Sequence, residues 1–308
     1  MAGRLAEKGK GIMTSGHFVD KVLIAIPVYN EARFIRETIE SALAQGTQIL
    51  VSDNASTDGT SEICQEYAKK GDISYIRHLK NMGVWRNFCY TAEQAAVPYF
   101  MWLGGHDVLP ADYIVTMMEA AAMHRDAVLF CPSSIEWLDE NGNMFEKECL
   151  AFDNLTSRRA FSRVWSAIQL THGCFCHGLF RREAVRSAFS LMMNENTASP
   201  DMPFLWSVAA AGRFQAVDCT YCRRSFRQLE SFRDTIRRQV KMLDLENVSP
   251  LTIWRRFRAF MFKAIDILEN HYVLSAYLER ILLKLYALHR YRFMRETVLS
   301  LDGGDYNE

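Results

Sequence analysis

Two short apolar segments, each followed by a polar turn, constrain the fold more than any other feature of this sequence. Residues 22–26 read Val-Leu-Ile-Ala-Ile and continue into Pro-Val-Tyr-Asn-Glu, and residues 48–52 continue into Asp-Asn-Ala-Ser-Thr-Asp-Gly-Thr. Residues 31–44, between them, carry apolar side chains at helix spacing. When one helix connects two strands of a sheet, the two strands run parallel to each other. We therefore expect both turns at the carboxyl edge of one sheet, where open α/β sheets bind ligands.

The alternation of strand and helix patterns continues along the first half of the chain. The expected elements are strands at 73–77, 99–103 and 127–131 and helices at 57–70, 87–96 and 110–125. This alternation is typical of a mostly parallel sheet with helices on its faces. The second half mixes shorter elements, with strands expected at 135–138, 174–180 and 214–218 and helices at 156–170 and 203–212.

Length and composition bound the domain organisation. We expect a disordered arm at 1–20, one α/β domain at 21–249 with halves at 21–131 and 132–249, and a helical extension at 250–308. The chain has 36 Lys plus Arg and 36 Asp plus Glu, which argues against a nucleic-acid partner, because such proteins carry a basic excess. No signal peptide precedes the first strand and no apolar run reaches the roughly 20 residues of a membrane span, so we expect a cytoplasmic protein with free thiols.

The two polar turns resemble those of family 2 glycosyltransferases of the GT-A fold. That family usually reads P-x-Y/F-N-E after its first strand and V-D-D-G-S-x-D-x-T after its second, and residues 27–31 and 51–60 are similar. The resemblance covers roughly residues 20 to 230. It implies a mostly parallel sheet flanked by helices and a hexosyltransferase-like enzyme that transfers a sugar, with inversion, from a nucleotide-sugar donor to a hydroxyl.

The resemblance also implies the partners and the nucleotide pocket. A UDP-sugar is the expected donor and a glycan or lipid-linked molecule the expected acceptor, in bacterial surface polysaccharide or lipid-linked glycan synthesis. The positions that match the nucleoside pocket of the family are Pro27, Tyr29, Glu31 and Asp53. For Asp53 an alternative stays open, since an Asp after a strand also caps its own turn.

Residues 80–87 contain an N-x-G turn that leads into a helix, as the family commonly has. Free N–H groups and the helix dipole at such a turn suit an anion. Asn81, Gly83 and Arg86 are therefore further candidates for contact with the nucleotide.

Residues 102–110 lie where the family has its D-x-D metal motif, usually L-D-x-D-D followed by Pro. Gly104 and His106 replace the first two acidic residues, and Asp107 retains the third. A divalent cation neutralises the charge of a leaving diphosphate, and Mn²⁺ accepts imidazole whereas Mg²⁺ prefers oxygen. We expect His106 and Asp107 to hold Mn²⁺ or Mg²⁺, with Mn²⁺ preferred. Loss of the metal, in a degenerate nucleotide-sugar or glycan-binding protein without turnover, is the alternative.

Acceptor-side candidates lie in the second half. Asp201 precedes a helix where the resemblance implies the catalytic base that takes the proton of the acceptor hydroxyl, with helix capping as the alternative and Glu195 as a second candidate. His172 and His177 precede an F-R-R-E segment and either face the acceptor cleft or pack. Arg224 belongs to a basic segment that is expected to form a lid over the diphosphate.

Residues 250–301 lie outside the resemblance. They carry two apolar stripes at helix spacing: Trp254, Phe257, Met261, Ile265 and Leu268 in the first helix, and Leu274, Leu278, Ile281, Leu285 and Leu288 in the second. Basic and aromatic residues accompany both stripes. Two roles stay open: packing within the chain or in a homodimer, and contact with an anionic membrane surface on the inner face of the cell membrane.

Overall fold

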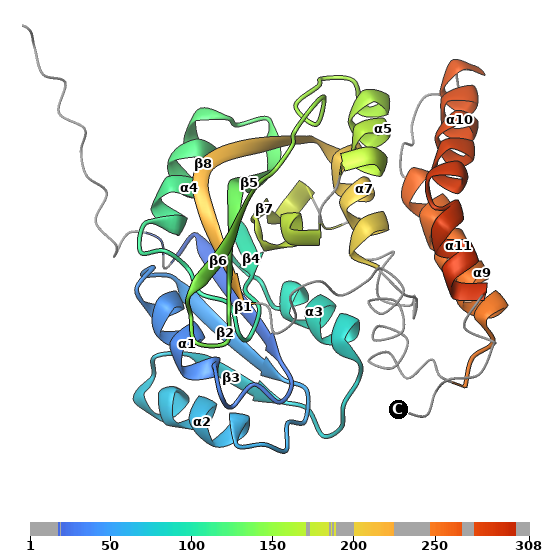
Figure 1. The fold of residues 1–308 in the computed structure, drawn as a ribbon. Helices are drawn as coiled ribbons and strands as arrows, with labels where there is room; N and C mark the ends of the chain where they lie inside the picture. Colours follow the sequence, from blue (N-terminus) through green and yellow to red (C-terminus); the bar gives the residue numbers. More distant parts are fainter. Residues whose placement is uncertain are drawn as a thin grey trace, which may run out of the picture.

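The computed structural model describes residues 18, 20–170, 173–184, 186, 188, 200–224, 247–266 and 274–299. An eight-stranded mixed sheet is flanked by helices, and the C-terminal helices pack to one side of it (Figure 1). The strands are β1 (Val22–Val28), β2 (Gln48–Asp53), β3 (Ser74–Arg77), β4 (Tyr99–Trp102), β5 (Ala127–Leu138), β6 (Met144–Cys149), β7 (Leu179–Arg181) and β8 (Arg213–Arg224). The helices are α1 (Ile35–Leu43), α2 (Thr60–Lys70), α3 (Val84–Glu93), α4 (Tyr113–Met123), α5 (Ala160–Leu170), η1 (Gly173–His177), α7 (Asp201–Ala211), α9 (Pro250–Asp266), α10 (Leu274–Arg290) and α11 (Arg292–Leu299).

The first half of the sheet is parallel, as the sequence predicts. β1 pairs in parallel with β2 and β4, and β2 pairs in parallel with β3. All seven residues of β1 are buried, which explains its continuous apolar sequence, because a central parallel strand is covered on both faces. Val28 lies opposite Asp53 in the ladder, so the polar turns after β1 and β2 begin side by side.

The second half of the sheet is mixed. β7 lies antiparallel between β4 and β5, β5 pairs antiparallel with β6, and β8 runs parallel to β5. The two strands expected at 127–131 and 135–138 are one long strand, whose register against β8 shifts between Pro132 and Ser134. A register shift accommodates proline, which has no N–H for the ladder.

The strand expected at 174–180 is wrong over most of its length. Gly173–His177 form the 3-10 helix η1, and the strand is confined to Leu179–Arg181. The apolar run Cys174-Phe175-Cys176 is buried in this turn, so burial explains its composition without strand pairing.

The C-terminal helices share the core of the sheet domain. Trp254, Phe257 and Met261 on α9 belong to the same buried cluster as Trp102 of β4 and Phe204 of α7. The described residues of the stripe on the first helix therefore pack within the chain, one of the two roles left open, and Leu268 lies outside the described residues. Among the helices in the described part of the chain, none combines the length and apolar character that a bilayer crossing requires.

The stripe expected on the second helix, for which packing and membrane contact were both left open, packs within the chain only in part. α10 buries Leu283 and Ala287, whereas Leu278 and Leu285 are 51% and 58% exposed. Of the other stripe residues, Leu288 is partly buried and packs against the core and Ile281 is half-buried, so the buried face of α10 coincides with the expected stripe only in part.

Candidate active site

The turns after β1 and β2 are tied to each other by hydrogen bonds. The backbone N–H of Asn30, which has a positive φ of 57°, donates to Ser56 Oγ at 2.9 Å, and the N–H of Glu31 donates to Thr60 Oγ1 at 2.8 Å. In return, Asn30 Oδ1 accepts from the N–H of Thr57 at 2.9 Å. Side chains of one turn thus satisfy the backbone of the other, which fixes the carboxyl edge of the sheet.

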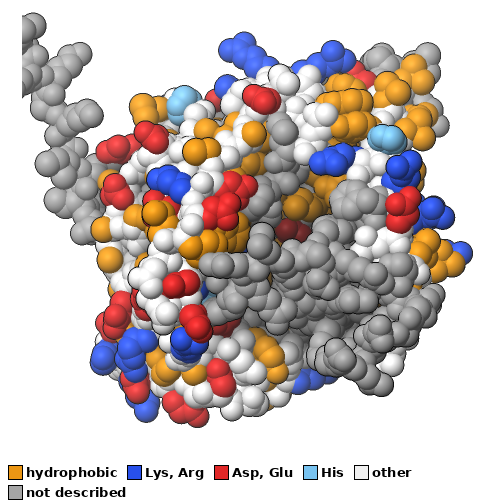
Figure 2. Space-filling model, viewed as in Figure 1, with side chains coloured by type: hydrophobic (Ala, Val, Ile, Leu, Met, Phe, Trp, Pro, Cys, Tyr) orange, Lys and Arg blue, Asp and Glu red, His pale blue; other side chains and the backbone are white. Residues whose placement is uncertain are grey.

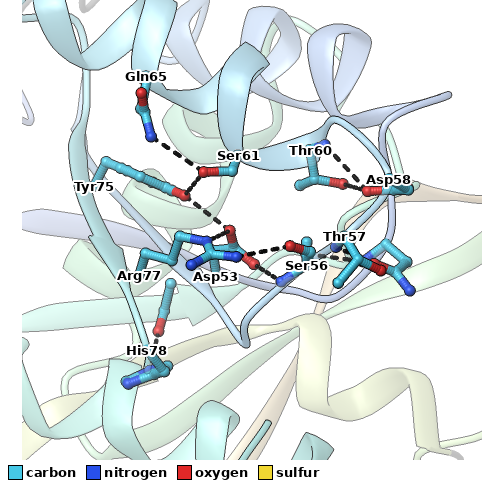
Figure 3. Close-up of polar contacts among 12 residues, drawn as sticks. Asp53, Ser56, Thr57, Asp58, Thr60, Ser61, Gln65, Tyr75, Arg77 and His78 are labelled. Atoms are coloured by element: carbon cyan, nitrogen blue, oxygen red, sulfur yellow. Dashed lines mark hydrogen bonds and ion pairs between the residues drawn. The ribbon is translucent and has the colours of Figure 1, made fainter. Parts of the chain in front are cut away.

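Asp53 supports the second turn from within (Figure 3). Its carboxylate is fully buried, and it accepts hydrogen bonds from the N–H of Ser56 and from the Tyr75 hydroxyl, both at 2.8 Å. Arg77 Nε lies 3.4 Å from Asp53 Oδ2. The turn-capping role that the sequence left open for Asp53 is therefore present, and a direct contact of Asp53 with a nucleotide stays a prediction.

A polar hollow of about 440 Å³ opens beside this network. It is lined by Ser56, Thr57, Gly59, Ser61, Glu62, Gln65 and Arg77. The lining does not include Glu31, His106 or Asp201. The hollow therefore does not mark the candidate reacting centre, which is assigned from the chemistry of those three side chains.

Pro27 and Tyr29 occupy different surroundings at the end of β1. Pro27 is buried in the strand, beyond the last residue of β1 that pairs with β4. Tyr29 is 46% exposed. An exposed aromatic ring at the carboxyl edge provides a face on which a nucleobase can stack.

The segment before α3 brings two of its three candidates to the same edge. Asn81 Oδ1 accepts from Asn54 Nδ2 at 2.7 Å and from the N–H of Gly83 at 2.8 Å. Gly83 precedes α3 with φ of 92°, a conformation that favours glycine. Arg86 is exposed in the first turn of α3.

His106 lies between Glu31 and Asp107. Its Nδ1–H donates to Glu31 Oε1 at 2.8 Å, since a carboxylate can only accept, and its Nε2 lies 3.8 Å from Asp107 Oδ1. Burial opposes the charged form of His106, but the bond to Glu31 and the charge of Asp107 outweigh it and raise the pKa of the imidazole. Glu31, expected in the nucleoside pocket, therefore orients His106.

Asp107 is held on both oxygens by protein groups. Tyr221 donates its hydroxyl to Oδ2 at 2.7 Å, and the N–H of Arg224 donates to Oδ1 at 2.9 Å. A Cβ on Gly104 would lie against Oδ2 and only 3.0 Å from Cγ of Asp107. Burial alone would raise the pKa of Asp107, but neighbouring positive groups, His106 foremost, lower it.

His106 and Asp107 could supply two protein ligands to a divalent cation. The described residues contain no group of three or more His, Cys, Asp or Glu side chains that could hold a metal. His106 Nε2 and Asp107 Oδ1 are 3.8 Å apart, which is less than twice the ligand distance of about 2.1 Å typical of Mg²⁺. A carboxylate on the other ring nitrogen, as Glu31 supplies, is the usual support of a metal-binding histidine. These residues would fit a cation whose remaining ligands would come from a diphosphate and water.

The structure places Arg224 in the core and not in a lid. Its side chain is 2% exposed, donates to the carbonyl oxygen of His106 at 3.0 Å and forms an ion pair with Glu37 at 2.8 Å. Residues 225–228 of the expected lid lie outside the described residues. The lid interpretation is therefore wrong for Arg224, which anchors the end of β8.

Arg223, the preceding residue of β8, faces the site instead. Its Nη1–H donates to Cys174 Sγ at 2.8 Å, and its guanidinium lies 5.3 Å from the centre of the Trp137 ring. Its charge contributes to the lowered pKa of Asp107 and offsets part of the rise that burial causes in the pKa of Asp201. Consecutive residues of a strand point to opposite sides, which explains why only one of the two arginines reaches the site.

Asp201 begins α7, a helix whose next residues are almost all buried. Its Oδ2 would lie 2.9 Å from a Cβ on Gly173, so the carboxylate fits against a position without a side chain. Asp201 is half-buried but closely surrounded by protein. Burial raises its pKa, despite opposing hydrogen bonds from the backbone N–H groups of Asp201 and Met202. A carboxyl group with a raised pKa is a better proton acceptor.

His177 packs in the core. It is 8% exposed, its Nδ1–H donates to the carbonyl oxygen of Trp102 at 3.0 Å, and its ring stacks on Tyr221 with centroids 4.7 Å apart. Burial lowers the pKa of His177 to about 4. His177 thus supports the tyrosine that binds Asp107, which agrees with the packing alternative. His172 and Glu195 lie outside the described residues.

The sequence analysis missed Tyr221, Arg223 and Tyr75 as parts of the site. Tyr221 and Arg223 are two residues apart on β8, so the period of a strand could have placed both on one face. Tyr75 reaches Asp53 from the neighbouring strand β3, and only the sheet order brings the two together.

Comparison with known proteins gives concordant matches. The model of the family "Glycosyl transferase family 2" matches residues 23–189. The abequosyltransferase RfbV of Salmonella typhimurium is 31% identical over 115 residues, which are 35% of this chain and 34% of that protein. The cholesterol galactosyltransferase of Borreliella burgdorferi is 24% identical over 226 residues, or 70% of this chain and 63% of that protein. The chain thus spans less than two thirds of the length of these relatives.

The fold has a counterpart among solved structures. Staphylococcus aureus TarS, residues 1–349 in complex with UDP-GlcNAc, superposes with a TM-score of 0.62 over 92% of this chain and 76% of that chain. The sequences are 17% identical, so this likeness concerns the fold alone. It agrees with the predicted GT-A architecture of a mixed sheet flanked by helices.

Proposed function

The chain belongs to glycosyl transferase family 2, and on that premise we propose that it is an inverting, hexosyltransferase-like enzyme that uses a nucleotide sugar. The observation that carries the proposal is a pair of carboxyl groups in contrasting surroundings. The pKa of Asp107 is lowered among positive groups, and that of Asp201 is raised by burial. Two carboxyls with separated pKa values are typical of sites that divide electrostatic and proton-accepting roles.

In the proposed reaction Asp201 accepts the proton of the acceptor hydroxyl while that oxygen attacks the anomeric carbon. The bond from the sugar to the diphosphate breaks as the new bond forms, and negative charge grows on the leaving diphosphate. The guanidinium of Arg223, whose charge acts on both Asp107 and Asp201, and the imidazole of His106 beside Asp107 would stabilise that charge. The exposed ring of Tyr29 would hold the base.

A divalent cation, Mn²⁺ in preference to Mg²⁺, is part of the proposal. His106 Nε2 and Asp107 Oδ1 would hold it, and Glu31 would keep the imidazole in the required tautomer. When bound, the cation would neutralise charge on the diphosphate. The preference for Mn²⁺ follows from the nitrogen ligand.

The donor, acceptor and location complete the proposal. TarS was crystallised with UDP-GlcNAc and with UDP, which supports a UDP-sugar as the donor. The names of the Salmonella and Borreliella relatives, an abequosyltransferase and a cholesterol galactosyltransferase, support transfer of a sugar. The acceptor that the family resemblance implies is a glycan or lipid-linked molecule of bacterial surface polysaccharide or lipid-linked glycan synthesis. We place the reaction on the cytoplasmic side of the membrane.

A second candidate is a nucleotide-sugar-binding protein without turnover. It is favoured by the packing at Gly104, where the carboxylate of Asp107 fills the space that an acidic side chain would need. In that case donors would bind without release of nucleoside diphosphate.

One experiment separates the two candidates. The full chain is screened with UDP-, GDP- and dTDP-sugars and Mn²⁺ for thermal stabilisation, since a ligand of the native state raises stability, and for release of nucleoside diphosphate. We expect both signals with one nucleotide class, and loss of release with retained stabilisation in Asp201→Asn. Asp72→Asn, an exposed carboxylate outside the site, is the matched control. Stabilisation without release would favour the binding protein, and neither signal would refute both.

A further inference from the structure

One face of α10 exposes a row of leucines. Leu278, Leu282 and Leu285 are 51%, 53% and 58% exposed. They follow one another at i, i+4 and i+7, so they lie on one face of the helix, opposite the buried Leu283 and Ala287. We refer to these three residues as the leucine stripe. Neither the fold nor the proposed transfer reaction explains its exposure.

An apolar groove adjoins the leucine stripe. It has a volume of about 430 Å³ and is lined by Asn154, Phe161, Ser162, Trp165, Ser166 and Leu282. Trp165 stacks on Tyr286 of α10 with ring centroids 3.9 Å apart. Because Leu282 belongs to both, stripe and groove form one continuous surface. Aromatic rings with polar edges beside exposed leucines are typical of the membrane–water interface.

The helices that carry this surface are strongly basic. Residues 250–299 contain nine Lys and Arg but four Asp and Glu, a net charge of plus five. The whole chain has 36 of each, so the remainder carries minus five. Exposed basic side chains on α9 to α11 include Arg255, Arg258, Arg290, Arg292 and Arg295. Figure 2 shows apolar and basic side chains side by side on the right, where these helices lie.

Charge decides between the two occupants that an apolar helix face most often has. In a symmetric dimer the same surface contacts itself, so two helical segments that each carry a net charge of plus five would approach each other and repel. An anionic lipid surface attracts each nearby basic residue and accepts apolar side chains beneath its headgroups. We propose that the leucine stripe and the adjoining groove dock the protein onto an anionic lipid bilayer, which the net positive charge of α9 to α11 attracts.

This inference goes beyond the proposed transfer reaction and is independent of it. The full chain is mixed with phosphatidylcholine vesicles, with or without about one third phosphatidylglycerol, and floated on a density gradient. We expect flotation with the anionic vesicles alone, and its loss when added salt screens the charges. Leu278→Ser/Leu285→Ser is expected to weaken partition at least about tenfold, because two apolar side chains no longer enter the lipid.

The matched control is Leu79→Ser/Met123→Ser, which removes two exposed apolar side chains from the sheet domain. It should float like the parent protein. The proposal is overturned if the parent protein floats with neither kind of vesicle, or if both double variants float equally well. It is also overturned if light scattering shows a dimer that Leu278→Ser/Leu285→Ser converts to a monomer. Loss of nucleotide-sugar turnover, by contrast, would leave the docking result unchanged.

Discussion

The close approach of Gly104 and Asp107 yields a quantitative prediction. Gly104 does not have a positive φ, so an alanine there is conformationally allowed, and its Cβ would instead press on the carboxylate of Asp107. That carboxylate is 1% exposed and is held by Tyr221 and Arg224, so it cannot move without losing hydrogen bonds. A bond to a charged group is worth about 1.5–3 kcal/mol, and partial relaxation gives an expected cost of about 3 kcal/mol for Gly104→Ala.

Thermal and urea unfolding of Gly104→Ala test this value. For a chain of this size the expected change is a Tm lowered by roughly 5–10 °C. In an Asp107→Ala background, which removes the obstructing carboxylate, Gly104→Ala should cost less than about 1 kcal/mol, and the difference is the coupling between the two positions. Gly104→Asp, which restores the acid that the family has, should destabilise further, because a second carboxylate would be buried beside the first. A Tm for Gly104→Ala equal to that of the parent protein would refute the reasoning.

Four other predictions follow from the site. Asp201→Asn should lower transfer by at least about 100-fold while calorimetry shows unchanged donor affinity, and an active variant would rule out the base. Transfer activity should vanish in chelator and should be restored better by Mn²⁺ than by Mg²⁺, and full activity in chelator would contradict this. His106→Ala should weaken Mn²⁺ binding, measured by electron paramagnetic resonance. Asp53→Ala should lose about 2–3 kcal/mol of unfolding free energy as well as nucleotide affinity, because its buried partners lose their acceptor. The pKa of His177 falls from 6.5 to about 4 on folding, so between those pH values only the unfolded state takes up this proton. The free energy of unfolding should therefore fall by up to about 1.4 kcal/mol for each pH unit of acidification, and His177→Gln should flatten that slope.

The parallel half of the fold was predictable because its signals are local. The apolar runs of β1 and β2 end in turns whose polar residues satisfy each other's backbone, as between Asn30 and Ser56. The chain direction through the intervening helix then fixes parallel pairing. The second half was less predictable because β5 and β8 pair across more than 80 residues, and such pairing has no local signature.

The site was predictable in its residue types but less so in their roles. Glu31 and Asp53 lie at the predicted edge, yet both bind other side chains: Glu31 orients His106, and Asp53 accepts from Tyr75. A motif gives positions along the chain, whereas the direction of a side chain depends on its neighbours in space. The choice of Arg224 over Arg223 failed for that reason, since the two residues point to opposite sides of β8.

The C-terminal helices connect the candidate base to the exposed leucines. α9 packs on α7, which begins with Asp201, and Tyr291, between α10 and α11, packs on Trp206 of α7 with ring centroids 5.3 Å apart. Removing the helices would therefore uncover the core that positions Asp201, so truncation cannot separate docking from catalysis. Substitution at Leu278 and Leu285 can, because both side chains point away from that core. A rigid connection of this kind would hold the candidate active site at a fixed distance from whatever surface the leucines contact.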